Sequence, residues 1–116
     1  MKKFLPLYVM ALCLFVAPAL ASDNLARLNG TWTIEGGQAQ PGTTLVIDAR
    51  NKAFSYDNGK TIHKGTFTVV LDEGDVISLQ ERESQDAARF TFQDNDTVHV
   101  RDVIVPDRQA TMKRVR

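Results

Sequence analysis

From Gly30 onward, apolar and polar residues alternate along the chain in short runs that are separated by turn-forming sequences. In the run 31–35, for example, Trp32 and Ile34 fall on one face and the threonines fall on the other. Seven further runs follow the same rule, at 43–49, 53–56, 61–71, 76–82, 88–93, 97–105 and 109–115. A period of two residues is typical of strands with one buried face, whereas an extended helix has a longer period. The pattern therefore predicts eight short β-strands.

Short turns join these runs and favour the pairing of each strand with the next. The sequence 57–59, Asp-Asn-Gly, is one such turn, because Asn and Gly tolerate the positive φ of tight hairpins. Sequential antiparallel pairing gives an up-and-down meander, and eight strands are enough to close it into a barrel without exposed edges. We therefore predict an all-β fold, a small eight-stranded antiparallel up-and-down barrel in one domain. The lead-in SDNLARLNG is expected to form a single helical turn.

The first residues have the pattern of a secretory signal peptide. Lys2 and Lys3 precede an almost uncharged apolar stretch at 4–18, and 19–21 reads Ala-Leu-Ala, the small-x-small form of a signal-peptidase site. We expect 1–21 to be a cleaved signal peptide and 22–116 to be the barrel domain. The short two-lysine start looks bacterial, which favours a periplasmic or secreted protein. No integral membrane span is expected after cleavage, because the apolar stretch is shorter than the roughly 20 residues that a spanning helix needs.

Composition narrows the function classes once this segment is set aside. Cys13 is the only cysteine of the chain and lies in the predicted signal peptide, so no disulfide is expected in the barrel. The barrel must then rely on a continuous apolar core. The whole chain has 14 basic and 14 acidic residues, and removal of two lysines leaves the acidic residues in slight excess. Nucleic acid is therefore not an expected partner, since its binders carry a basic stripe.

Gly30-Thr31-Trp32 directly follows the lead-in and opens the first predicted strand. A meandering eight-strand barrel that begins with a helical turn and Gly-x-Trp resembles the lipocalin family, within the calycin-type barrels. In that family the Trp plugs the closed end of the barrel, and an Arg from the last strand packs across its ring. Arg114 matches this Arg by its order and parity, so the resemblance implies a structural motif of Gly30, Trp32 and Arg114 and a Trp32–Arg114 cation–π pair.

The chain departs from that family in three respects. It is much shorter than a typical lipocalin, it lacks the Thr-Asp-Tyr signature in its middle, and no helix follows the last strand. It is therefore similar to a minimal bacterial lipocalin-like domain.

The size of the inward-facing residues bears on ligand binding. An eight-stranded barrel is wide enough either to be filled by its own side chains or to hold one small ligand. The inward positions carry many bulky side chains: Trp32, Leu45, Ile47, Phe54, Tyr56, Phe67, Leu71, Ile77, Leu79, Phe90, Phe92 and Met112. This bulk favours a filled core, and the alternative is a small apolar pocket near the open end. The expected lining of such a pocket is Phe54, Tyr56, Phe67, Phe90 and Phe92, with the Tyr56 hydroxyl as a polar anchor.

The sequence contains no motif that indicates catalysis or metal binding. His63 and His99 alternate with apolar neighbours and are expected to face solvent. The chain has no Gly-x-Ser-x-Gly and no metal-ligand spacing, and the acidic turns 72–75 and 94–96 favour solvated hairpins over weak calcium sites. We expect no enzyme activity, no cofactor and no metal site.

Asp102 does not fit the pattern, because the parity of Val98 and Val100 would bury it. A β-bulge that resets the register is the favoured explanation. The alternative is that Asp102 points into the barrel and pairs with Arg82 or Arg89.

Two functional classes follow from these observations. The first is an exported, non-catalytic lipocalin-like binding protein for a small hydrophobic molecule, which predicts an interior void beside Phe67 and Phe90. The second is a protein-binding module, such as a periplasmic protease inhibitor or immunity protein, which acts through its outer surface. An exposed apolar patch or a protruding arm would favour this second class. A stress-related envelope protein without a ligand is a third alternative.

Overall fold

The computed structural model describes residues 23–37, 39–105 and 107–116. The predicted signal peptide, with Cys13, lies outside these residues. Within them, no helix is both long and apolar enough to cross a membrane.

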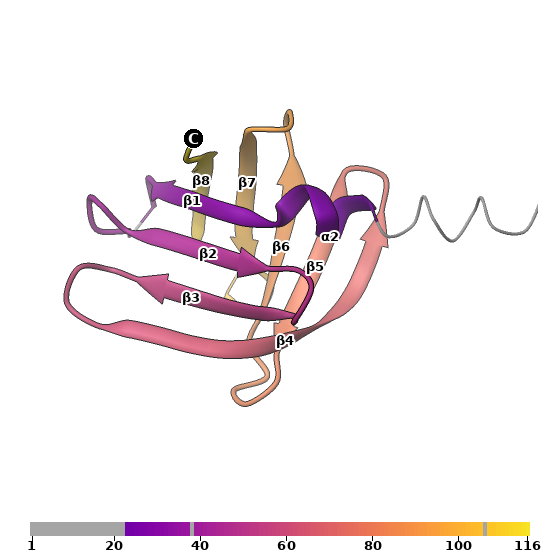
Figure 1. Cartoon of the computed structure of the whole chain (residues 1–116), viewed down its shortest axis with the longest axis horizontal. Helices are drawn as coiled ribbons and strands as arrows, with labels where there is room; N and C mark the ends of the chain where they lie inside the picture. Colours follow the sequence, from indigo (N-terminus) through magenta and orange to yellow (C-terminus); the bar gives the residue numbers. More distant parts are fainter. Residues whose placement is uncertain (1–22, 38, 106) are drawn as a thin grey trace, which may run out of the picture.

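A short helix, α2 (Asp23–Leu28), precedes eight strands (Figure 1). The strands are β1 (Gly30–Glu35), β2 (Thr44–Asp48), β3 (Ala53–Asp57), β4 (Ile62–Glu73), β5 (Val76–Glu81), β6 (Ala87–Phe92), β7 (Thr97–Asp102) and β8 (Gln109–Arg114). Each strand pairs with the next in antiparallel fashion, and β1 also pairs with β8, so the sheet is a closed barrel in up-and-down order. The predicted fold class and the helical turn before it are confirmed.

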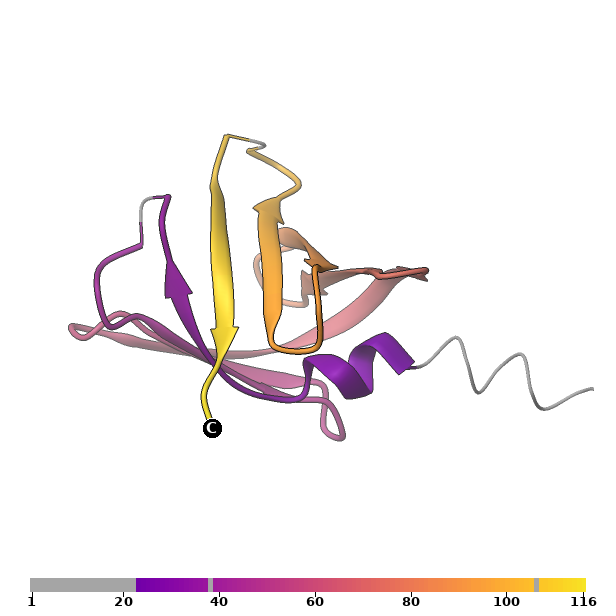
Figure 2. The same ribbon diagram turned by 90° about the horizontal axis from the view of Figure 1, so that it is seen from above.

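The two halves of the barrel cross at a steep angle. Figure 1 shows β1, β2 and β3 running across the view and β6, β7 and β8 running nearly perpendicular to them. The long strand β4 bends from one direction to the other, and Figure 2 shows α2 lying at one end of the barrel. This helix contacts β4 and β5. The helix therefore covers one end and leaves the other end to be formed by strand ends and loops.

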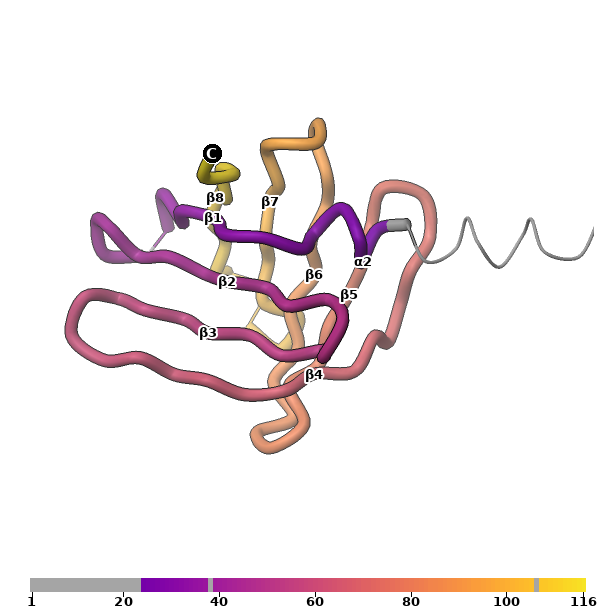
Figure 3. The backbone as a smooth tube through the Cα atoms, in the orientation of Figure 1, coloured from indigo at the N-terminus to yellow at the C-terminus, as the bar shows by residue number. Residues whose placement is uncertain are grey.

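A β-bulge in β4 resets the alternation of inward and outward side chains. Val69 pairs with Leu79, but the next paired residue is Leu71, opposite Ser78, so Val70 is the extra residue. The bend is visible in the chain trace of β4 (Figure 3). Asp72 then pairs with the fully buried Ile77 and shares its inward side. The prediction that Leu71 faces inward is therefore wrong, because the bulge turns it to the outer wall.

The core is a continuous apolar cluster inside the barrel. Its buried members are Leu28, Trp32, Ile34, Leu45, Ile47, Phe67, Ile77, Leu79, Phe90, Phe92, Val98 and Met112. Each strand from β1 to β8, apart from β3, contributes at least one of these side chains, and Phe54 and Tyr56 of β3 pack against the cluster as half-buried residues. The alternation of inward and outward side chains along short strands thus builds one core, and the described residues contain no cysteine that could add a disulfide.

Candidate functional site

The end of the barrel beside α2 is closed around Trp32, which is fully buried. Its indole nitrogen donates a hydrogen bond to the carbonyl oxygen of Leu28 at 2.8 Å. The guanidinium of Arg114 lies over the ring, 4.3 Å from its centre. The expected contact between Trp32 and Arg114 is therefore present, and it joins the first and last strands of the barrel.

The Arg114 guanidinium also holds the backbone around this end. Nη2 donates to the carbonyl of Arg27 at 2.6 Å, and Nη1 donates to the carbonyl of Asn29 at 3.0 Å. Nε and Nη2 donate to the carbonyl of Asn95, and Nε also reaches Asp96 Oδ1 at 3.2 Å. One side chain therefore ties the lead-in helix, β8 and the turn between β6 and β7 together.

Gly30 makes room for this arrangement. It has a φ of +131°, which L side chains rarely adopt, and a Cβ at this position would lie 3.0 Å from Arg114 Nη1. The glycine of the Gly-x-Trp sequence is thus required by both its backbone conformation and the close approach of the guanidinium.

A second cation–π contact lies at the same end, between Arg27 and Phe92. The Arg27 guanidinium carbon is 4.0 Å from the centre of the Phe92 ring. Arg27 also donates to Asn24 Oδ1 at 2.9 Å and forms an exposed ion pair with Asp75 at 3.0 Å. Phe92 therefore belongs to the closed end, and its predicted place in a pocket lining is wrong.

A cavity of about 600 Å³ occupies the rest of the barrel interior. Its apolar wall includes Ile34, Leu45, Ile47, Phe54, Tyr56, Phe67, Leu79, Phe90, Val100 and Met112. The filled core that side-chain bulk favoured is therefore wrong. Inward-facing small residues, among them Ala88 and Ala110, also line the space, and they offset the bulk of the aromatic rings. Four of the five aromatic residues expected to line a pocket do so, namely Phe54, Tyr56, Phe67 and Phe90.

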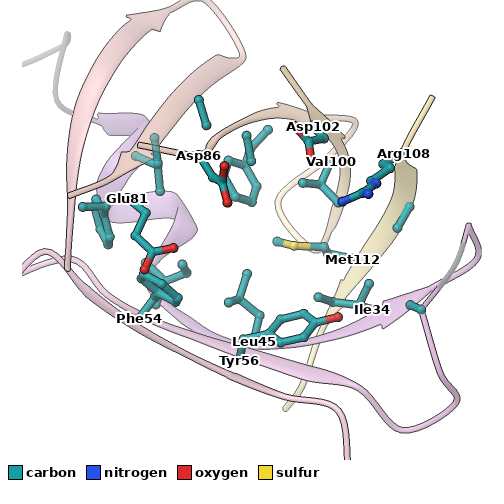
Figure 4. Close-up of a pocket in the computed structure, with 18 of the residues that line it drawn as sticks. Ile34, Leu45, Phe54, Tyr56, Glu81, Asp86, Val100, Asp102, Arg108 and Met112 are labelled. Atoms are coloured by element: carbon teal, nitrogen blue, oxygen red, sulfur yellow. The ribbon is translucent and has the colours of Figure 1, made fainter. Parts of the chain in front are cut away.

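Charged side chains gather at the edge of this cavity. Glu81, Asp86, Asp102 and Arg108 contribute to its lining, and the imidazole of His63 lies among them. Figure 4 shows Glu81 and Asp86 directed into the same space, with Arg108 on the other side of it. Glu81 was not singled out from the sequence, although it has the same parity as Ile77 and Leu79, and this signal would have placed it inward.

The His63 side chain is 58% exposed, as expected, but it also contributes to the lining of the cavity, which was not expected. It pairs across the strands with the inward-facing Tyr56, and its Nε2 lies 2.9 Å from Glu81 Oε2. The neighbouring Ile62 takes the outer side, where it is 60% exposed. His99 does face outward as expected, since it pairs with Thr91 and Thr111 and its Nε2 lies 2.9 Å from Gln109 Oε1.

Gly65 leaves space between Phe54 and Glu81, two residues of the cavity lining. Its position is on the inward side of β4, opposite Phe54. A Cβ there would lie 2.9 Å from Phe54 Cε1 and 3.1 Å from Glu81 Oε2. The absence of a side chain at Gly65 therefore allows an aromatic ring and a carboxylate to approach each other at the cavity wall.

Asp102 lies on the cavity side without a bulge. β7 is in continuous register with β6 up to Asp102, which pairs with Ala88. Its Oδ1 accepts hydrogen bonds from the backbone N–H groups of Ile104 at 2.8 Å and Val105 at 3.1 Å. The favoured bulge was therefore wrong, and so were the arginines named as partners, because Asp102 is satisfied by the loop that follows it.

The two carboxylates whose pKa values are lowered, Asp48 and Asp96, lie outside the cavity. The pKa of Asp96 lies below its usual range because Arg116 donates a hydrogen bond to it, and the charges of Arg116 and Arg114 act in the same direction. The pKa of Asp48 is also lowered, chiefly by the hydrogen bond from the Asn51 side chain. In the described part of the chain, no group of three or more His, Cys, Asp or Glu residues could hold a metal ion.

Comparison with known proteins bears on the fold alone. No family model matches the chain, and no curated protein matches it in sequence. Among solved structures it is similar to Tp0751 (pallilysin) of Treponema pallidum, with a TM-score of 0.61 and 16% sequence identity. The match covers 93% of this chain and 97% of that chain. The two proteins therefore share a barrel fold over almost their full lengths.

Proposed function

We propose that this chain is an exported, non-catalytic lipocalin-like binding protein that holds a small hydrophobic molecule in its barrel. The observation that carries the proposal is the cavity of about 600 Å³, lined mainly by apolar and aromatic side chains. Ligand pockets in proteins span roughly 300 to 1,000 Å³ and combine such walls with a few polar groups. The cavity therefore has the size and chemistry of a small-molecule site.

The closed end supports the lipocalin-like part of the proposal. Gly30, Trp32 and Arg114 have the sequence order and the contacts that the resemblance implies, including the hydrogen bonds from Arg114 to the lead-in backbone. A barrel closed at one end and lined with charged groups at the other has a single route for a ligand.

Native mass spectrometry of the protein isolated from its own cell envelope tests the proposal. We expect a small-molecule mass that is lost on denaturation. In parallel, the delipidated protein is titrated with the apolar fluorophore N-phenyl-1-naphthylamine, for which we expect saturable binding. Ala88→Phe places a ring inside the cavity and should abolish this binding, while Val70→Phe on the exposed bulge should not. A clean apo mass together with no binding of the fluorophore would overturn the proposal.

A second candidate function, a protein-binding module, is favoured by one surface feature. Val103, Ile104 and Val105 follow β7 as an exposed apolar stretch, with exposed fractions of 44%, 56% and 38%. Exposed apolar patches mark protein-interaction sites more often than isolated apolar residues do. The same mass spectrum separates the two functions, because a bound protein adds kilodaltons and a small ligand adds hundreds of daltons.

Export is part of the proposal and has its own measurement. A basic start, an apolar stretch and Ala-Leu-Ala at 19–21 support cleavage after Ala21. N-terminal sequencing of the protein from the periplasmic fraction should begin at Ser22. A protein that retains Met1 in the cytoplasm would exclude export.

A further inference from the structure

The cavity is apolar in its depth and charged at its mouth. Its deep wall includes Phe67, Phe90 and Met112, none of which is more than 5% exposed. The charged groups of the lining are three carboxylates, Glu81, Asp86 and Asp102, and one guanidinium, Arg108. The lining of the mouth therefore carries an excess of negative charge.

Within the described residues, Glu81 has the least exposed side chain of the contacts between acidic and basic residue types. Its side chain is 13% exposed, whereas the side chain of His63, its neighbour across the strands, is 58% exposed. Oε2 lies 2.9 Å from His63 Nε2, and Oε1 accepts a hydrogen bond from the Ser84 hydroxyl at 3.0 Å. In the described part of the chain, no Lys or Arg pairs with this carboxylate, so its charge has no permanent cation beside it. A shielded carboxylate is stabilised by a cationic partner.

An aromatic ring borders the same part of the wall. Phe54 lies opposite Gly65, and both its ring and the Glu81 carboxylate come within about 3 Å of the place where a Gly65 side chain would begin. The Phe54 ring also lies beside His63, with ring centres 5.6 Å apart. A carboxylate next to an aromatic ring provides both charge and a π-system for an ammonium group.

We propose that the ligand is a cationic amphiphile, whose ammonium group binds to Glu81 on the cavity side of the Phe54 ring and whose apolar body extends toward Phe67 and Met112. This inference rests on the proposed function, because it assigns a chemical class to the occupant of the same cavity. Asp86 adds charge of the same sign at the exposed rim, and Figure 4 shows it directed toward the space that Glu81 enters.

Arg108 is the group that opposes this assignment. Its side chain is exposed and lies on the other side of the cavity from Glu81 (Figure 4). The carboxylate head group of an anionic amphiphile would bind to Arg108, so anionic amphiphiles are the alternative class of ligand. The two classes of ligand differ in the charge of the head group, so probes with the same alkyl chain and different head groups distinguish them.

The experiment compares three probes with the same chain and different heads: decylamine, decanol and decanoate. Each is titrated calorimetrically at neutral pH, below its aggregation concentration, into delipidated protein. We expect decylamine to bind at least about tenfold more tightly than decanol, as a charge-assisted hydrogen bond would give, and decanoate to bind most weakly. Equal binding of all three, or tightest binding of decanoate, would overturn the cationic class and leave the apolar cavity function standing. No binding of any probe would overturn the cavity function itself.

Glu81→Gln tests the assignment of the head group. This change keeps the shape and the hydrogen-bonding capacity toward Ser84 but removes the charge. We expect decylamine affinity to fall about tenfold while decanol affinity stays unchanged. Glu83→Gln, on the exposed turn after β5, removes the same charge away from the cavity lining and should leave both affinities unchanged. Equal loss of decylamine affinity in both variants would contradict a specific role for Glu81.

Discussion

Arg114 lies over the ring of Trp32, 4.3 Å from its centre, while its nitrogens donate to backbone carbonyls of the helix end and of the β6–β7 turn. The planar guanidinium can stack on a ring and donate in several directions in its own plane. A lysine ammonium cannot do both. The closure of this end of the barrel therefore depends on the planar shape of the guanidinium as well as on its charge.

Arg114→Lys should lower the free energy of unfolding by about 2 kcal/mol, because carbonyls of Arg27, Asn29 and Asn95 lose charge-assisted donors. Urea unfolding followed by tryptophan fluorescence measures this directly, since Trp32 is the only Trp of the chain and is fully buried. Arg82→Lys, at an exposed position, is the matched control and should leave the midpoint unchanged. Equal stability of the two variants would show that the charge alone suffices.

Asn24→Ala should detach α2 from the β4–β5 hairpin. The Asn24 side chain is buried and donates to Asp72 Oδ1 at 2.9 Å and to the carbonyl of Gly74 at 2.8 Å. Loss of a buried donor that leaves acceptors unsatisfied costs about 1–3 kcal/mol of unfolding free energy. Urea unfolding of the variant should show a loss in this range.

Asp75→Asn is the comparison for this prediction, because it breaks the only ion pair between the same helix and hairpin in the described residues. The Asp75 side chain is 68% exposed, and exposed ion pairs contribute about 0.2–1 kcal/mol. Asp75→Asn should therefore cost less than Asn24→Ala. The reverse order would mean that charge, and not the buried amide, holds the helix.

Most of the fold follows from the period of two in the sequence. The alternation places Trp32, Leu45, Phe67 and Phe90 inside, and short turns leave sequential pairing as the simplest topology. The bulge at Val70 could not be predicted, because it lies in a run of consecutive apolar residues where a shift of one position leaves the hydrophobic pattern almost unchanged. That shift decides whether Leu71 or Asp72 faces the interior.

The filled core was favoured over the pocket for a different reason. Sequence reasoning weighed bulky inward side chains, whereas the free volume depends on the small ones that face them, such as Gly65, Ala88 and Ala110. Which residues face each other requires the strand register, and the strand period alone does not give it. The contribution of His63 to the cavity lining was also not predicted, although its parity with Phe67 in β4 indicated an inward position.

Asp96→Asn should change how stability depends on pH. The hydrogen bond and charge of Arg116 lower the pKa of Asp96 in the folded protein below its ordinary value of 3.8. At pH values near 3.8 and just below it, Asp96 therefore binds a proton more readily in the unfolded chain than in the folded one. The stabilising contribution of Asp96 is complete above the ordinary value and is lost as the pH falls through the folded pKa. The wild type should exceed Asp96→Asn in unfolding free energy at neutral pH, and the difference should vanish in acid.

Urea unfolding of both proteins across a pH series measures this difference. Asp48, whose pKa is also lowered, is present in both proteins, so its effect cancels. Glu83→Gln is a control for the loss of a negative charge and should run parallel to the wild type. A difference between wild type and Asp96→Asn that persists unchanged in acid would contradict the assignment of this effect to the Asp96 carboxylate.

Gly65→Ala should disturb the cavity wall without straining the backbone, since Gly65 does not have the positive φ of the turn glycines. The added Cβ would lie 2.9 Å from the Phe54 ring and 3.1 Å from the Glu81 carboxylate, so at least one of them must move. Overpacking of this kind costs about 1–3 kcal/mol of unfolding free energy. N-phenyl-1-naphthylamine should also bind more weakly, because a displaced Phe54 ring alters the wall on which the probe packs. Lys64→Ala, one residue earlier and exposed on the outer face, should change neither property. A Gly65→Ala protein with wild-type stability and binding would mean that the wall adjusts freely, and that the closeness of Phe54 and Glu81 does not depend on this glycine.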